Sequence, residues 1–300
     1  MPPVKHARTS SLDIAYEESG PADATPVFLM HGFPYDPRTY DGVVPLLSAQ
    51  SCRTIVPYLR GYGPTRFLSN ETMRSGEQAA LGNDLKELMD ALKIERAFLC
   101  GYDWGGRACC VVAALWPERA RGLVTGGGYN VHDVQGSAKP ADAAQEHRAW
   151  YQYYFCTPRG VAGLTENRRD IAKLLWQLWL VGEPFDAALF EKSAPSFDNP
   201  DFVDVVIHSY RVRYGYVAGD PSLAEIERQL AAKPAITVPT IAMHGEADGI
   251  ALPSSSEGHA RHFRGPYQRR VVPRAGHALP QDAPQAVADA VLELLQTAAA

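Results

Sequence analysis

Residues 95–107 read Glu95-Arg-Ala-Phe-Leu-Cys-Gly-Tyr-Asp-Trp-Gly-Gly-Arg107, and the organisation of the whole chain can be understood from this segment. Its first half contains a short apolar run, residues 97–100, of the kind found in buried strands. Gly101 precedes Asp103 by two residues and Gly105-Gly106 follow it, so the chain can reverse sharply and enter a helix. Small residues around one reactive side chain are typical of a nucleophile elbow, here with an aspartate where a serine is usual. The alternative interpretation is a plain turn in which Asp103 caps the helix that follows.

Apolar strand-like runs alternate with amphipathic helical segments on both sides of this segment. We expect two strands within residues 4–18 and further strands at 26–30, 53–57, 97–100, 121–125, 238–244 and 268–272. Helices are expected at 38–49, 76–93, 254–263 and 282–295, and beyond the elbow itself. Alternation of this kind predicts an α/β fold with a mostly parallel, doubly wound sheet of about eight strands.

The alternation stops at about residue 130, and residues 133–235 contain long helical segments without convincing strands. We therefore expect a core domain of residues 1–132 and 236–300, with a helical cap domain of residues 133–235 inserted into it. In such sheets the site forms beyond the carboxyl ends of the strands. The loops that follow predicted strands carry Phe33, Asp103, Asp248 and His277, and the cap leaves from the same edge.

Composition excludes several classes of function. A net charge of −5 and a pI near 6.0 give no electrostatic support for nucleic-acid binding. Five cysteines without regular spacing provide no zinc pattern, so we expect neither a metal nor another cofactor. The N-terminal residues lack the apolar segment of a leader, and no window resembles a membrane span, so we expect a cytoplasmic protein without membrane association. The oligomeric state stays open, with a homodimer as one option.

A nucleophilic acid needs a general base and a second acid that orients the base. His277, preceded by Gly276, is the histidine that follows the last predicted strand. The second acid follows the strand before it, where Glu246 and Asp248 compete. We favour Asp248 because it is nearer the outward tip of its loop, in the chain order nucleophile, acid, histidine.

Two motifs resemble one known family. His31-Gly32-Phe33-Pro34 is similar to the oxyanion loop, and Gly101-Tyr-Asp-Trp-Gly-Gly106 to the aspartate elbow, of the epoxide hydrolase and haloalkane dehalogenase branch of the α/β-hydrolase fold. The resemblance extends over nearly the whole chain and is closest to the epoxide hydrolases. Esterases and lipases are disfavoured because no Gly-x-Ser-x-Gly motif occurs.

The resemblance implies a hydrolase that opens epoxides to vicinal diols through a covalent ester of Asp103. His277, oriented by Asp248, would activate the water that cleaves this ester. Backbone N–H groups of Phe33 and Trp104 would form the oxyanion hole. The lid tyrosines Tyr151 and Tyr210 match the family residues that activate the epoxide oxygen. For a hydrophobic small-molecule substrate we expect a pocket that includes His31, Pro34, Trp150, Gln152 and Ala278.

Two other interpretations use the same residues. A haloalkane dehalogenase would bind halide through Trp104, but Phe33 stands where that family usually has an asparagine, so a lid tryptophan would have to substitute. Fluoroacetate dehalogenases share Phe33 and Arg107 but have an arginine where this chain has Trp104. The least favoured interpretation is a non-catalytic ligand-binding protein on the same fold.

Overall fold

A single sheet organises the computed structural model, which describes residues 3–182 and 184–299. Within that part of the chain nine strands pair in the order β1-β2-β4-β3-β6-β7-β8-β9, with β5 added to β2. All pairs from β4 to β9 along this order are parallel, whereas β1, β2 and β5 join antiparallel. This confirms the predicted α/β fold. The strands are β1 (Lys5–Arg8), β2 (Leu12–Ser19), β3 (Pro26–Met30), β4 (Arg53–Pro57), β5 (Arg66–Phe67), β6 (Ala97–Tyr102), β7 (Ala120–Gly126), β8 (Thr240–Gly245) and β9 (Tyr267–Val272).

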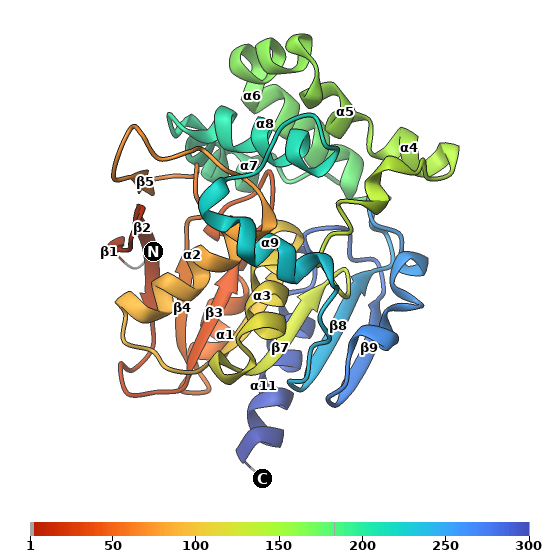
Figure 1. Ribbon diagram of the computed structural model, residues 1–300. Helices are drawn as coiled ribbons and strands as arrows, with labels where there is room; N and C mark the ends of the chain where they lie inside the picture. Colours follow the sequence, from red (N-terminus) through yellow and green to blue (C-terminus); the bar gives the residue numbers. More distant parts are fainter. Residues whose placement is uncertain (1–2, 183, 300) are drawn as a thin grey trace.

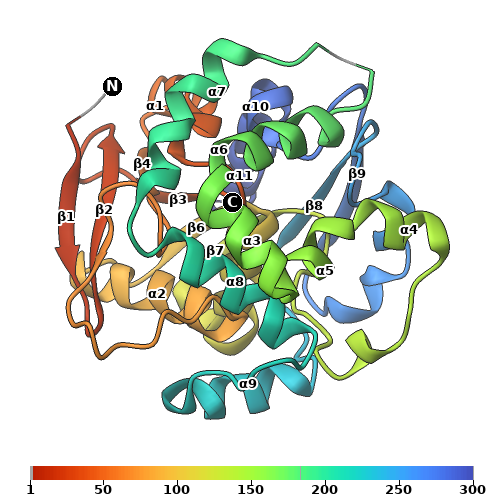
Figure 2. The ribbon, with the colours of Figure 1, turned by 90° about the horizontal axis from the view of Figure 1, so that it is seen from above.

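Helices cover both faces of the sheet, as Figure 2 shows from above. On one face α2 (Gln78–Ala91) packs against α3 (Asp103–Leu115), and on the other α1 (Val43–Ser48) packs against α11 (Pro284–Ala299). The central strands are therefore buried on both sides, which explains why they are nearly continuous apolar runs. Within the described residues, no helix combines the length and the apolar character that a membrane crossing would need.

The helical insertion lies over the carboxyl ends of the parallel strands, at the top of Figure 1. It contains α4 (Ala143–Arg148), α5 (Trp150–Cys156), α6 (Pro158–Trp179), α7 (Ala187–Ser193) and α8 (Phe202–Arg213). The chain then descends through α9 (Ala224–Ala231), which packs on α2 and α3 of the core. The carboxyl ends of the parallel strands lie level with one another beneath these helices. Met30 of β3 pairs with Gly101 of β6, and Gly245 of β8 pairs with Val272 of β9.

Two expected helices differ from the structure. The segment 38–49 is divided into a 3₁₀ turn (Pro37–Tyr40) and the short α1, which follows Gly42 and contains Pro45 in its first turn. The segment 254–263 forms two 3₁₀ helices (Pro253–Ser256 and His259–His262) separated at Gly258. The remaining short elements are 3₁₀ helices at Pro117–Arg119, Gly136–Ala138, Ala194–Asp198 and Pro221–Leu223, and α10 at Leu279–Asp282.

Candidate active site

The turn between β6 and α3 holds Asp103 in a strained backbone conformation, with φ of +50°. Residues other than glycine rarely adopt this left-handed region, and such strain is concentrated at functional sites. The flanking glycines make the turn possible. A Cβ at Gly105 would lie 2.0 Å from the carbonyl oxygen of Met30, and one at Gly101 would lie 2.5 Å from the carbonyl oxygen of Gly105. The chain therefore has the strand–turn–helix elbow that its small residues predict.

The carboxylate of Asp103 faces a backbone donor on one side and an imidazole on the other. Its Oδ1 accepts a hydrogen bond of 2.7 Å from the backbone N–H of Phe33. Its Oδ2 lies 3.5 Å from Nε2 of His277. Burial opposes ionisation of Asp103, but His277, Arg107 and the Phe33 N–H outweigh it and lower the pKa of this carboxyl. Asp103 is therefore ionised at neutral pH.

His277 is held by a second carboxylate. Its Nδ1 donates to Oδ2 of Asp248 at 2.9 Å, and Oδ1 of Asp248 accepts the backbone N–H groups of Ile250 (2.8 Å) and Ala251 (2.9 Å). Burial disfavours the charged ring, yet the two neighbouring carboxylates raise the pKa of His277 to about 10. In the resting protein the imidazole is therefore protonated at neutral pH.

Glu246, the competing acid, has a different position. Its side chain is exposed, and its carboxylate accepts the backbone N–H of Arg274 at 3.2 Å. Asp248 is thus the acid that contacts His277, two residues further along the same loop. The difference arises because Asp248 is drawn inward by the hydrogen bonds of its own turn.

A cavity of about 590 Å³ lies between these groups and the cap. The core lines this cavity with Asp103, Asp248 and His277. The cap lines it with Tyr151 and Gln152 of α5. The carboxylate of Asp103 and the ring of His277 can therefore reach the same small molecule. A cavity of this size with a few convergent polar groups is typical of a small-molecule site.

The two lid tyrosines have unequal access to this cavity. Tyr151 lines it, and its hydroxyl oxygen accepts a hydrogen bond of 3.0 Å from Nε2 of Gln152. Tyr210 packs behind it with ring centroids 5.5 Å apart, and is not among the residues that line the cavity. Burial raises the pKa of both phenols, so both keep their protons at neutral pH.

Four residues expected in the substrate pocket do not line the cavity, whereas Gln152 does. His31 is fully buried beneath its loop, where Nε2 accepts the N–H of Leu59 at 3.1 Å. The carbonyl oxygen of Pro34 accepts a hydrogen bond of 2.7 Å from the Nε1–H of Trp176. Ala278 is buried, and its carbonyl oxygen accepts the first N–H groups of the turn that follows. The fourth residue is Trp150, whose ring lies against Tyr154 at 6.0 Å.

The side chains of the two residues expected at the oxyanion hole, Phe33 and Trp104, are buried away from the cavity. The ring of Phe33 is buried and stacks with that of Trp104 at 5.6 Å. Neither side chain lines the cavity. The N–H of Phe33 already points at an oxygen of Asp103.

The expected pocket residues did not include a group of basic side chains that lie in the cavity wall: Arg107, His132, Arg213, His244 and His259. A signal for Arg107 was available, because it follows Asp103 by four residues on α3 and such residues share one face of a helix. His132 follows β7, Arg213 belongs to α8 of the cap, His244 lies near the end of β8, and His259 begins a 3₁₀ helix, all far from the elbow in sequence. No local pattern could have indicated them.

Comparison with known proteins shows the family of the chain. The chain matches the family described as alpha/beta hydrolase fold over residues 25–284. It is 30% identical to epoxide hydrolase B of Mycobacterium tuberculosis over 56% of this chain and 48% of that protein. It is 27% identical to a haloalkane dehalogenase of Psychrobacter cryohalolentis over 57% of this chain and 54% of that protein. The chain thus spans about half the length of these two curated relatives.

A solved structure gives a longer match. The crystal structure of a candidate epoxide hydrolase from Klebsiella pneumoniae superposes with a TM-score of 0.95. The two sequences are 43% identical, and the match covers 98% of this chain and 97% of the other.

Proposed function

The chain belongs to the alpha/beta hydrolase fold family and is a hydrolase, and from this premise we propose that it opens epoxides to vicinal diols through an ester of Asp103. The observation that carries the proposal is the carboxylate of Asp103, presented by a strained elbow to the cavity beneath the cap and flanked by His277. A serine alkoxide suits attack on an acyl carbon. A carboxylate instead suits displacement at a saturated carbon that carries a strained or good leaving group.

In the first step, one carboxylate oxygen of Asp103 attacks a ring carbon of the epoxide. A C–O bond to Asp103 forms while the ring C–O bond breaks, and its electron pair remains on the departing oxygen as an alkoxide. The alkoxide takes the hydroxyl proton of Tyr151, whose oxygen is oriented by Gln152. The proton of the His277 imidazolium then restores the phenol and leaves His277 neutral.

In the second step, neutral His277 takes a proton from a water molecule, and the resulting hydroxide attacks the carboxyl carbon of Asp103. The N–H groups of Phe33 and Trp104 stabilise the oxyanion, each such donor being worth about 3 kcal/mol. The ester C–O bond to the substrate then breaks, and the departing diol oxygen takes the proton of the new carboxyl group. Asp103 is again a carboxylate and His277 an imidazolium, so one water molecule has been added overall.

Dehalogenation is the second candidate, and one feature favours it. The indole N–H of Trp104 is buried without a hydrogen-bond partner among the described residues, as a halide-binding donor would be. Trp104 does not line the cavity, however, whereas the phenol of Tyr151 does. The accessible donor is thus a phenol that can transfer its proton to an alkoxide, which favours the epoxide reaction.

The covalent step is tested by His277→Gln, which removes the base of the second step. Incubation with a good substrate should increase the protein mass by the whole mass of the epoxide, because ring opening expels no fragment. A haloalkane would instead add its mass less that of the hydrogen halide. Asp103→Asn is the control and should gain no mass under the same conditions. Unmodified His277→Gln protein, after exposure to a substrate that the wild type consumes, would exclude the ester.

A side-by-side assay separates the two chemistries. Diol formation from aryl and alkyl epoxides is measured beside halide release from bromoalkanes and fluoroacetate, at equal enzyme concentration. We expect diol formation. Halide release without diol formation would replace this proposal with a dehalogenase.

A further inference from the structure

A narrow crevice reaches His277 separately from the main cavity beneath the cap. It is lined chiefly by α6, the chain that follows α6, and α10, and His277 is the one described residue that it shares with the main cavity. Two of its lining residues, Gln177 and Asp186, are exposed, whereas Tyr35 and Trp179 are buried. The crevice therefore leads from the surface of the protein to the ring of His277.

The size of the crevice selects water. Its space of about 60 Å³ holds a few water molecules, since each of them needs about 10–15 Å³ of such space. Small-molecule sites usually offer about 300–1,000 Å³, and the main cavity, of about 590 Å³, lies in this range. The substrate therefore occupies the main cavity and not the crevice.

Hydrogen bonds and ring contacts fix the walls of the crevice. The Nε1–H of Trp176 donates to the carbonyl oxygen of Pro34 at 2.7 Å, and its ring stacks on that of Tyr35 with centroids 4.4 Å apart. The carbonyl oxygen of Trp179 accepts the N–H of His277 at 3.2 Å, and the two rings meet edge-on with centroids 5.0 Å apart. These contacts tie the cap wall to the core, so the crevice is a constant feature of the fold.

Gln281, which lines the crevice, has an acceptor atom without a partner. It belongs to α10, the short helix after His277, and its backbone N–H donates to the carbonyl oxygen of Ala278 at 2.8 Å. Its side-chain Oε1 is buried and has no hydrogen-bond partner among the described residues. A buried acceptor of this kind is costly unless a donor satisfies it. The partner that this place requires is therefore a hydrogen-bond donor small enough for the crevice.

Water suits this place better than a cation, although both satisfy an amide oxygen. Burial opposes the charged form of His277, but Asp248 and Asp103 raise its pKa to about 10. A cation in the crevice would be repelled by this imidazolium, whereas a water molecule is not. Water can also donate one hydrogen to Gln281 and keep the other for a base.

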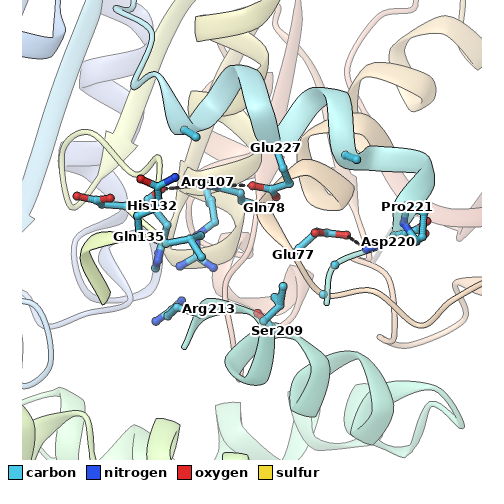
Figure 3. A pocket seen from close by; sticks show the side chains of 17 residues that line it. Glu77, Gln78, Arg107, His132, Gln135, Ser209, Arg213, Asp220, Pro221 and Glu227 are labelled. Atoms are coloured by element: carbon cyan, nitrogen blue, oxygen red, sulfur yellow. Dashed lines mark hydrogen bonds between the residues drawn. The ribbon is translucent and has the colours of Figure 1, made fainter. Parts of the chain in front are cut away.

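The remaining space around the site reaches His277 only through the main cavity. A second cavity, of about 380 Å³, adjoins the main one and shares Arg107, His132 and Arg213 with it. Figure 3 shows these three basic side chains at one side of the second cavity. Neither Asp103 nor His277 is among the described residues that line it. Water from there would have to cross the main cavity, which the substrate occupies once it is esterified to Asp103.

We propose that the crevice is a water port, which supplies the hydrolytic water to His277 while the ester of Asp103 fills the main cavity, and that Gln281 holds this water supply in place. In the second step of the proposed reaction, the delivered water loses a proton to neutral Nε2 of His277, and its oxygen attacks the carboxyl carbon of Asp103. Gln281 is a positioning residue, because it acts on the water supply and not on the substrate. The inference rests on the proposed ester and adds the route of its water.

The test compares substrates that fill the main cavity with substrates that leave room for water in it. Gln281→Met keeps the length of the side chain and removes its acceptor. With the largest epoxide that the wild type accepts, in a series from propylene oxide to trans-stilbene oxide, ester hydrolysis should slow about tenfold while ester formation is unchanged. With propylene oxide both steps should change by less than about twofold. Rapid-quench single-turnover kinetics measures the two steps, and Gln285→Met, at an exposed position, is the matched control.

The outcomes separate the port from the reaction. Equal slowing of hydrolysis with small and large epoxides would assign Gln281 a structural role only, and unchanged hydrolysis with all of them would show that the crevice supplies no water. Either result rejects the port and keeps the ester. If haloalkanes and not epoxides yield the ester, the same comparison of small and large substrates decides the port while the epoxide reaction is rejected. Failure to form any ester would reject the reaction and the port together.

Discussion

At the scale of single residues, Asp248 determines both the orientation and the charge of His277. Its Oδ2 accepts the Nδ1 proton at 2.9 Å, which directs Nε2 toward Asp103. Together with Asp103 it raises the pKa of His277 to about 10, against the effect of burial. Esterification of Asp103 removes one of these two negative charges. In the proposed reaction the pKa of His277 then falls, so the ring would become available as a base only after the first step.

Asp248→Asn should therefore slow ester hydrolysis far more than ester formation. We expect the hydrolytic rate constant to decrease by about 10² to 10⁴, because the amide no longer stabilises the imidazolium or selects its tautomer. Rapid-quench single-turnover kinetics, with the covalent species followed by mass spectrometry, measures the two steps separately. Glu246→Gln is the matched control, two residues away and exposed, and should leave both steps unchanged. A larger effect of Glu246→Gln would contradict the assignment of Asp248.

At the scale of elements, the elbow works because the loop after β3 fits closely against the start of α3. A Cβ at Gly32 would lie 2.5 Å from Cβ of Asp103 and 2.8 Å from its Oδ1. Real side chains do not approach so closely, so the absence of a side chain at Gly32 is what brings the N–H of Phe33 to 2.7 Å from the carboxylate.

Gly32→Ala should displace this loop from the elbow. We expect the rate constant of ester formation to fall by about 10²-fold, since a shift near 1 Å at a reacting group has effects of that size. Overpacking should also lower the free energy of unfolding by about 1–3 kcal/mol. Urea titration and single-turnover kinetics measure the two effects. Gly258→Ala is the control, because its added methyl would meet only the flexible end of Arg261. Full activity of Gly32→Ala would show that the contact is not required.

At the scale of the whole molecule, a buried carboxylate joins the core to the cap. Asp36, in the loop after β3, accepts the hydroxyls of Ser193 and Ser196 from the cap, each at 2.7 Å, and the N–H of Arg38 at 3.0 Å. Burial outweighs these donors and raises the pKa of Asp36 to about 6. Because this folded-state pKa is above the unfolded value, stability decreases as the pH rises from about 4 to 6, and the cost of ionisation is complete above 6.

The double variant Ser193→Ala and Ser196→Ala should destabilise the protein by about 3 kcal/mol at pH 8, because two hydrogen bonds to a buried charge are lost. The loss should be smaller at pH 5, where Asp36 is protonated and needs fewer donors. Urea unfolding at the two pH values measures this difference. Ser255→Ala, at an exposed position, is the control. An equal loss at both pH values would show that the carboxylate charge is not what the cap serines stabilise.

The cap also holds the loops of the candidate site through its backbone. The carbonyl oxygen of Trp179, the last residue of α6, accepts the N–H groups of Gly249 and His277, both at 3.2 Å. The loops that carry Asp248 and His277 are therefore positioned by Trp179, a residue far from both of them in the chain. The division into a core and a cap of residues 133–235 stays a prediction, and α9 within that range packs on the core.

The sequence by itself determined the sheet and the elbow. Strand periodicity and the glycines around Asp103 are local properties, so β3, β4 and β6 begin where the apolar runs begin, and the turn lies where the small residues allow it. It also brought Asp103, Asp248 and His277 to one edge of the sheet, because parallel strands place their following loops together.

Only the tertiary structure decided which side chains meet. Asp248, and not Glu246, contacts His277. His31 and Pro34 do not line the cavity, whereas Arg213 of the cap and Arg107 of the core both do. These outcomes depend on distances of a few ångströms between residues far apart in the chain. No periodicity records such distances, because they are set by how the cap packs on the core.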